Sequence, residues 1–258
     1  MRLLVVSTSF PKKAGDSLSP FMWDYCRFLK NLGWDITVLV PHHKGLKIEE
    51  TWDGVRILRF QYLPESLEDL AYSGGLLPGL KSSPWKGLKI PFFIRSMYKE
   101  TLNIISRENI NIVNFHWFFP VSFWLGALLR KTNIPVVLTG HGTDVHLAKK
   151  NPFRYFANKA LSKSSAVTVN SEYMRSILAD LETPERVEVI PMGVDTEKFR
   201  STGPGLINLK KILYIGRLIE QKGVGLLLDA FRTVIESVPE AVLEIVGYGP
   251  EKTRLREK

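Results

Sequence analysis

Residues 211–224 read Lys-Ile-Leu-Tyr-Ile-Gly-Arg-Leu-Ile-Glu-Gln-Lys-Gly-Val. The apolar run 212–215 ends in Gly216, a pattern typical of a buried parallel strand that enters a tight turn. Arg217 and Lys222 follow on the loop and helix start beyond the carboxyl end of that strand. Because ligands of open α/β sheets bind at this edge, the segment is a candidate binding site.

The turn after this strand combines two glycines with two cations. Gly216 and Gly223 allow the backbone to approach a ligand closely, and the N-terminus of the following helix favours an anion. Arg217 and Lys222 can therefore hold a diphosphate without a metal ion. The alternative interpretation is a solvated basic turn, since structural loops of this kind are common.

Three neighbouring blocks bear on that choice. Residues 189–199 read Val-Ile-Pro-Met-Gly-Val-Asp-Thr-Glu-Lys-Phe, residues 225–231 read Gly-Leu-Leu-Leu-Asp-Ala-Phe, and residues 243–251 read Leu-Glu-Ile-Val-Gly-Tyr-Gly-Pro-Glu. In this order and spacing they closely resemble the retaining glycosyltransferases of family 4, which have the GT-B architecture. The resemblance extends from the first strand to the last residue, and its specificity comes from the blocks together.

The resemblance implies an α/β fold of GT-B type. We expect a Rossmann-like, parallel-sheet domain on the acceptor side over residues 1–200. Residues 201–258 would then begin the nucleotide-sugar-binding domain with its first β-α-β unit. In the family that domain continues well beyond this point, so we expect the chain to be a truncated or incomplete form. A lone β-α-β piece would leave sheet edges unpaired and one apolar face poorly covered.

Catalytic roles follow from the resemblance residue by residue. The turn 140–144, Gly-His-Gly-Thr-Asp, is similar to a family turn whose histidine lies at the donor sugar. His141 is the matching residue, and Arg217 and Lys222 match the cations that stabilise the leaving diphosphate. We interpret Asp144 as the N-cap of a helix that starts at Val145.

The remaining site residues are assigned to donor or acceptor contacts. Gly15, Gly193 and Gly216 match positions where backbone approaches the donor. Asp16 and His116 are assigned to the acceptor or the cleft. The first loop departs from the family pattern of paired glycines, since residues 12–15 are Lys-Lys-Ala-Gly.

The chain before the linker alternates strand and helix patterns. We expect strands over 2–7, 36–40, 110–115, 135–139, 166–170 and 186–190, edge strands within 51–62, and helices over 20–32, 121–131 and 171–178. Pro20 suits a first helical turn and Gly33 a C-cap. Residues 200–208 form the linker, followed by strand 211–215, helix 222–237 and strand 241–246. The opening β-loop-α-β unit lacks the G-x-G-x-x-G sequence of dinucleotide enzymes.

Residues 64–90 form a long connection rich in glycine and proline, which is usually functional or mobile. It leads into 85–99, where aromatic and basic residues interleave. A helix from about Pro91 has two interpretations. It is a core helix with a charged outer face, or it docks on a membrane surface or a lipid-linked acceptor.

Composition narrows the class of protein. The formal net charge is +9, but no helix-turn-helix, zinc or RNA-binding signature accompanies it, which argues against nucleic acid as a partner. Attraction to anionic lipid headgroups and an ordinary lysine-rich surface both remain. The single cysteine, Cys26, fits a reducing compartment, and no His, Cys or carboxylate pair has metal-ligand spacing.

The sequence thus predicts an enzyme that moves a sugar from a nucleotide-sugar, such as a UDP- or GDP-sugar, to an acceptor hydroxyl with retention. The acceptor would be lipid-linked or a glycan, and the resemblance implies no catalytic metal and no other cofactor. We expect a cytoplasmic protein, peripheral on the inner face of the membrane if 85–99 contacts lipid. The alternative is a catalytically incomplete fragment that acts as an acceptor-, membrane- or partner-binding module. A GT-B epimerase or phosphorylase fits the sequence blocks poorly.

Overall fold

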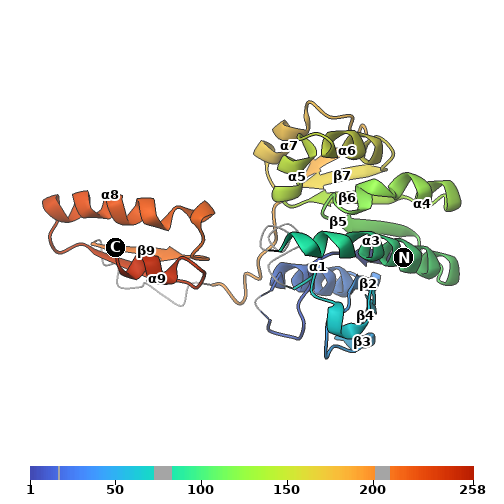
Figure 1. The fold of residues 1–258 in the computed structure, drawn as a ribbon, viewed down its shortest axis with the longest axis horizontal. Coiled ribbons are helices and arrows are strands. Elements are labelled where there is room, and N and C mark those ends of the chain that lie inside the picture. The colour runs from blue at the N-terminus through green and yellow to red at the C-terminus, as the bar shows by residue number, and fades with distance from the viewer. Residues whose placement is uncertain (17, 73–82, 201–209) are drawn as a thin grey trace. The chain divides into compact units, whose positions relative to one another are not determined.

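The computed structural model describes residues 1–16, 18–72, 83–200 and 210–258. Most of the expected linker and part of the 64–90 connection lie outside these residues. The chain divides into two compact units, Met1–Lys198 and Phe199–Lys258 (Figure 1).

An eight-stranded sheet forms the centre of the first unit, in the order β3-β4-β2-β1-β5-β6-β7-β8. The strands are β1 (Arg2–Val6), β2 (Asp35–Pro41), β3 (Glu49–Trp52), β4 (Val55–Phe60), β5 (Ile112–His116), β6 (Val136–Gly140), β7 (Ala166–Val169) and β8 (Val187–Val189). Neighbouring strands pair in parallel except for the antiparallel edge pair β3–β4. The chain adds β2 and β4 on one side of β1 and then crosses to β5 on the other, so the strand order reverses between β1 and β5.

Helices connect these strands and cover both faces of the sheet (Figure 1). They are α1 (Pro20–Asn31), α3 (Ile90–Arg107), α4 (Leu125–Lys131), α5 (Thr143–Ala148), α6 (Phe153–Leu161) and α7 (Glu172–Leu178), with short 3₁₀ turns at Glu65–Leu67, Pro84–Lys89 and Val121–Phe123. Ser171 caps α7 as predicted, because its hydroxyl accepts the N–H of Met174 at 3.3 Å. The predicted helix over 121–131 is wrong in part, since a 3₁₀ turn and α4 meet at Trp124.

Alternate residues of β1 enter different cores. Leu3 and Val5 pack with α1, whereas Leu4 and Val6 pack with the cluster that includes α3, α4 and α6. Successive side chains of a strand point to opposite faces, so a strand buried on both faces must be apolar at every position. This arrangement confirms the predicted α/β class with a Rossmann-like parallel sheet.

Helix α3 buries one stripe and exposes another. Phe93, Met97, Thr101 and Ile104 are buried at helical spacing, which supports a core helix for its inner face. Within the described ranges, no helix is long and apolar enough to cross a bilayer.

The second unit contains β9 (Lys211–Ile215), a 3₁₀ turn (Glu220–Lys222), α8 (Val224–Ser237), β10 (Val242–Val246) and α9 (Lys252–Arg256). Strands β9 and β10 pair in parallel as a two-stranded sheet. The expectation that 212–215 is buried is wrong for this structure, because Leu213 and Ile215 are exposed. Two strands and the helices described here cover too little of the sheet to bury both of its faces.

Candidate functional site

The ends of β1, β5 and β6 form one edge of the first sheet. Val6 pairs with Phe115, and His116 pairs with Thr139, so these strands end nearly level. The strand order reverses here between β1 and β5, and in open α/β sheets such a switch point is where ligands bind. The residues that follow the strands are therefore the first candidates for a site.

Two predicted site residues meet at this edge. Nδ1 of His116 lies 2.9 Å from Nε2 of His141, and the two rings stack with centroids 5.1 Å apart. His116 is only 4% exposed, and His141 is partly buried. Burial lowers the pKa of His141 to about 4 and that of His116 well below its ordinary value, so both rings are neutral at pH 7.

Aromatic rings enclose this histidine pair. Trp117 and Phe21 lie against His141, with centroid distances of 4.4 and 5.4 Å, and Tyr25 meets His116 edge-on at 5.0 Å. Trp117 has a φ of +69°, a left-handed conformation that costs a non-glycine residue roughly 1 to 3 kcal/mol. Backbone strain of this kind persists where the surroundings fix it, and it concentrates at functional sites.

A series of side-chain hydrogen bonds connects the elements around the histidine pair. The Tyr25 hydroxyl donates to Oδ1 of Asn114 at 2.8 Å, and Nδ2 of Asn114 donates to Oγ1 of Thr139 at 2.9 Å. Thr139 is in turn 2.7 Å from the hydroxyl of Thr168. These hydrogen bonds link α1 to β5, β6 and β7, so the four elements hold the residues of the site in fixed relative positions.

Asp144 does not cap a helix starting at Val145, contrary to the sequence prediction. Helix α5 already begins at Thr143 after Gly142, and the buried carboxylate of Asp144 accepts the N–H groups of His141 and Phe118 at 2.9 and 2.8 Å. Burial raises the pKa of Asp144, and these donors oppose that shift. Asp144 therefore ties together the two loops that carry the histidines.

The loop after β1 holds Gly15 and Asp16. Asp16 accepts the N–H groups of Lys12 and Leu18 at 2.9 and 3.1 Å, so its carboxylate shapes the loop itself. Gly15 is exposed with a φ of +78°, which a side chain would strain.

Gly193 lies on the exposed segment after β8, where a Cβ would meet open space. That segment is anchored by Asp195, which accepts from the N–H groups of Glu197 and Lys198 and pairs with Arg27 of α1 at 3.1 Å. The backbone N–H of Lys198 and then the Arg27 guanidinium lower the pKa of Asp195. The ion pair between Asp195 and Arg27 therefore connects the Gly193 segment to α1, the helix that also carries Phe21 and Tyr25.

In the second unit, backbone hydrogen bonds join the turn after β9 to the end of β10 and the turn after it. Gly216 donates to the carbonyl of Val246 at 3.0 Å, and Leu218 donates to that of Tyr248 at 2.8 Å. A Cβ at Gly247 would lie 1.9 Å from the carbonyl oxygen of Gly216, a distance that no side chain tolerates. Close backbone packing therefore fixes the turn that carries Arg217.

Arg217 and Lys222 are both exposed. Among the residues described, neither side chain has a hydrogen-bond or ion-pair partner, whereas Lys211 and Lys258 in the same unit pair with carboxylates. Lys222 ends the 3₁₀ turn directly before Gly223 and the N-terminus of α8. The two cations and the free N–H groups of this helix are available to an anion.

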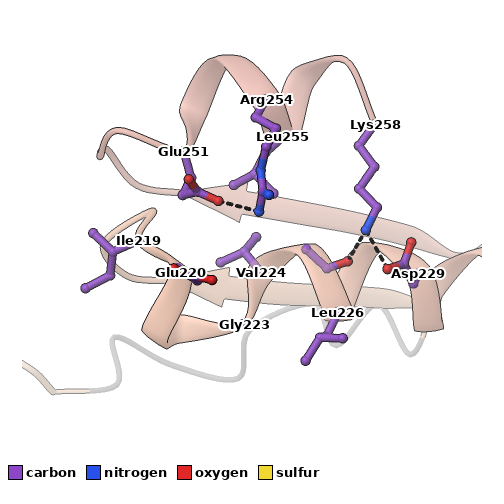
Figure 2. Close-up of a pocket in the computed structure, with 11 residues that line it drawn as sticks. Ile219, Glu220, Gly223, Val224, Leu226, Asp229, Glu251, Arg254, Leu255 and Lys258 are labelled. Atoms are coloured by element: carbon purple, nitrogen blue, oxygen red, sulfur yellow. Dashed lines mark hydrogen bonds and ion pairs between the residues drawn. The ribbon is translucent and has the colours of Figure 1, made fainter.

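A cavity of about 270 Å³ lies between α8 and α9 (Figure 2). Its cations are already engaged, because Arg254 pairs with Glu251 and Lys258 with Asp229. Arg217 and Lys222 do not line it. We therefore assign no role in the predicted anion site to this cavity.

Some residues of the site were missed from the sequence. Phe21, Asn114 and Trp117 lie in runs whose apolar spacing indicated only core packing, although Trp117 directly follows His116. Arg27 gave no signal, since its partner is 168 positions away. In the part of the chain with described coordinates, no three His, Cys, Asp or Glu side chains gather as metal ligands would.

Comparison with known families fits this geometry. The model of Glycosyltransferase Family 4 matches residues 19–198. The chain belongs to glycosyltransferase family 4. A second model, Glycosyl transferases group 1, matches residues 198–258.

Curated relatives of this family 4 chain include three from distant organisms. It is 30% identical over 206 residues to the uncharacterized glycosyltransferase MJ1178 of Methanocaldococcus jannaschii, covering 77% of the chain and 56% of that protein. It is 24% identical to TuaC of Bacillus subtilis, a putative teichuronic acid biosynthesis glycosyltransferase, covering 100% and 68%. It is 30% identical to a GDP-mannose-dependent alpha-(1-6)-phosphatidylinositol monomannoside mannosyltransferase of Mycobacterium tuberculosis, covering 99% and 63%. The chain thus spans a little over half to about two thirds of these relatives' lengths.

Solved structures agree on the fold. A trehalose-6-phosphate enzyme from E. coli, bound with UDP-2-fluoro glucose, matches with a TM-score of 0.69 at 14% identity over 100% of this chain and 68% of its own. A starch synthase IV catalytic domain from Arabidopsis thaliana matches with a TM-score of 0.62 at 10% identity, covering 100% and 70%. At such identities the likeness establishes the GT-B fold alone.

Proposed function

We propose that the full-length protein transfers a sugar from a nucleotide-sugar donor to an acceptor hydroxyl, with retention at the anomeric carbon. Membership of glycosyltransferase family 4 supports the reaction class. The observation that carries the proposal is the pair of cations Arg217 and Lys222, at the carboxyl edge of β9 and the start of α8, whose side chains have no partner among the described residues. This is where an α/β sheet binds phosphate.

The chemistry explains why cations are needed there. Departure of a nucleoside diphosphate builds negative charge on the phosphate oxygens, so preorganised cations stabilise the transition state more than the ground state. Arg217 can bind two phosphate oxygens at once, and Lys222 adds a compact charge. In this proposal no step requires a metal ion or another cofactor.

The first unit supplies the remaining contacts in this proposal. His141 contacts the donor sugar, and Gly15 and Gly193 let backbone approach the donor. Asp16 shapes the loop on the acceptor side. His116 lies behind His141 and is almost fully buried, which favours an indirect role over contact with an acceptor.

GDP-mannose is the first donor to test, because the names of the mycobacterial mannosyltransferases state that dependence. A UDP-sugar is the second. We propose that the acceptor is lipid-linked or a glycan, because the names of the same mycobacterial relatives include a phosphatidylinositol monomannoside.

The test compares three variants of the full-length protein. We expect Arg217→Ala and Lys222→Ala each to lower kcat/KM for transfer roughly 100-fold or more, the loss seen when one transition-state donor is removed. Lys252→Ala, which removes an exposed cation of α9, is the matched control and should stay within about threefold of the parent. Near-normal transfer by both first variants would refute the assignment.

A binding module is the second candidate function. It would hold an acceptor, a lipid surface or a partner without transfer. Acceptor binding by the full-length protein, with no transfer from any GDP- or UDP-sugar, would favour it over the enzyme.

We also propose that the protein works at the inner face of the membrane through an exposed stripe formed by Trp85, Leu88 and Phe92. These side chains are 79, 69 and 53% exposed and follow one another at helical spacing. Residues 84–107 carry five cationic residues and one acidic residue. Two of these cations, Lys86 and Lys89, pair with Asp69. A surface on which exposed apolar side chains lie among basic ones suits anionic lipid.

Vesicle sedimentation tests this docking. We expect the 258-residue chain to pellet with vesicles containing phosphatidylglycerol more than with phosphatidylcholine alone, and less as salt rises. The triple variant Trp85→Ser, Leu88→Ser and Phe92→Ser should lose binding, whereas Leu32→Ser, at an equally exposed leucine, should not. Absence of binding at low salt would remove the membrane proposal and leave the transferase proposal unaffected.

A further inference from the structure

The hydrogen bond between the two histidines contains one proton whose position has chemical consequences. Nδ1 of His116 and Nε2 of His141 are 2.9 Å apart. A neutral imidazole has one N–H donor and one bare nitrogen acceptor. Both rings are kept neutral by burial, so one of the two nitrogens must donate and the other must accept.

The second nitrogen of His116 indicates which ring donates. Nε2 of His116 is fully buried and has no partner among the described residues. If His116 accepted at Nδ1, its own proton would lie on Nε2 as a buried, unpaired N–H. Orphaned N–H groups are the rarest unpaired polar groups in protein interiors, rarer than underused acceptors.

The nearest ring offers little compensation for such an N–H. Tyr25 lies 5.0 Å from His116, centroid to centroid, and its hydroxyl is already used on Asn114. Only a contact with the aromatic face would remain, which is weak compared with a true hydrogen bond. Donation from Nδ1 of His116 leaves a bare nitrogen at the buried position instead.

We propose that His116 donates its Nδ1–H to His141 and thereby fixes His141 with its proton on Nδ1. His116 is then a positioning residue that acts through His141. Nδ1 of His141 is not among the fully buried unpaired atoms, and no described residue binds it, so this nitrogen reaches solvent. The site presents a neutral N–H donor there.

This assignment restricts what His141 can do. At its open nitrogen it donates a hydrogen bond to an oxygen, such as a sugar hydroxyl, and cannot remove a proton from one. The identity of that oxygen rests on the proposed glycosyl transfer, but the position of the proton does not. Neutral imidazole in water prefers the proton on Nε2, so the folded protein would hold the less common form.

Nitrogen NMR of the 258-residue chain tests the proton position directly. With ¹⁵N-labelled histidine rings at pH 7.5, we expect Nδ1 of His141 to be protonated and Nε2 to be bare. A His141→Gln spectrum assigns the signals. Protonated Nε2 in the parent protein would overturn the proposal.

Two substitutions of His116 separate positioning from packing. In His116→Asn the amide N–H replaces Nδ1–H, and we expect His141 to keep its proton on Nδ1. In His116→Leu the donor is gone, and His141 should change to the Nε2–H form. An unchanged His141 in His116→Leu would contradict the role of His116, and the parent spectrum decides the proton position even if a variant fails to fold.

Kinetics of the full-length protein provide the functional measurement. We expect His116→Leu to lower kcat/KM roughly tenfold, the loss of one buried hydrogen bond, and His116→Asn to restore most of it. A protein that shows the Nδ1–H form but no transfer would contradict the proposed function and keep this inference. A protein that transfers sugar with His141 in the Nε2–H form would do the reverse.

Discussion

Strands β1 and β9 have similar sequences and different surroundings. Residues 2–6 read Arg-Leu-Leu-Val-Val and residues 211–215 read Lys-Ile-Leu-Tyr-Ile, each a cation followed by four largely apolar residues. The four apolar side chains of β1 are buried, because this strand lies between two others and helices cover both faces of the sheet. Leu213 and Ile215 of β9 are exposed. An apolar run therefore predicts a strand, whereas its burial depends on the elements around it.

The two candidate sites differ in the same way. Burial in the first unit keeps His116 and His141 neutral, so their chemistry depends on desolvation and on which nitrogen holds a proton. The second unit offers two exposed cations on a turn fixed by backbone packing. Loss of packing should therefore disturb the first site most, and loss of charge the second.

The largest effect should come from matched leucine truncations in the two strands. Leu4→Ala in the 258-residue chain should lower the free energy of unfolding of the first unit by about 2 to 5 kcal/mol, because it leaves a cavity at a fully buried position. Leu213→Ala, at a side chain that is 54% exposed, should cost less than about 1 kcal/mol. Denaturant unfolding followed by tryptophan fluorescence and by amide exchange measures both units. Equal costs would show that β9 is packed in solution.

An intermediate effect should appear on acidification. The unfolded chain takes up protons at its histidines below about pH 6.5, whereas folded His141 resists protonation down to about pH 4. The free energy of unfolding should therefore fall by roughly 1 to 3 kcal/mol as the pH is lowered from about 6.5 to about 4. Asp144, whose pKa is raised by burial, acts in the opposite direction at the acid end.

Substitutions identify the histidine responsible. His141→Gln should reduce the fall in stability over that window, and the fall that remains comes from His116, whose pKa is also lowered by burial. His146→Gln, at an exposed histidine of α5, should leave the fall unchanged. A parent-like slope in His141→Gln would show that other groups cause the pH dependence. Unfolding curves at half-unit pH steps are sufficient.

The smallest effect should follow Arg27→Ala. The pair with Asp195 is partly exposed, and such pairs contribute about 0 to 1 kcal/mol, so global stability should hardly change. Amide exchange over residues 191–198 should nevertheless quicken, because α1 no longer anchors that segment. Arg2→Ala, which breaks the exposed pair with Asp35, is the control and should leave exchange at 191–198 unchanged.

Local sequence signals predicted the elements well. The strand over 211–215 and the cap at Ser171 lie where the sequence placed them, because apolar runs and caps depend on neighbours within a few residues. Asp144 was misinterpreted since a carboxylate near a helix start suits a cap equally well. Its partner Phe118 is 26 positions away.

Contacts that depend on sheet register could not be predicted. His116 and His141 meet only because β5 and β6 pair with His116 beside Thr139. The left-handed backbone of Trp117 likewise could not be predicted, because nothing in its residue type indicates it. The sequence identified both histidines as candidates, and the structure shows that His116 is almost fully buried whereas His141 is only partly buried.

The 1.9 Å approach at Gly247 has a consequence for protein engineering. Position 247 cannot be varied independently of position 216, because any side chain there displaces the carbonyl of Gly216 and the neighbouring Arg217. A library that varies this turn to test the proposed sugar transfer should therefore keep Gly247 constant.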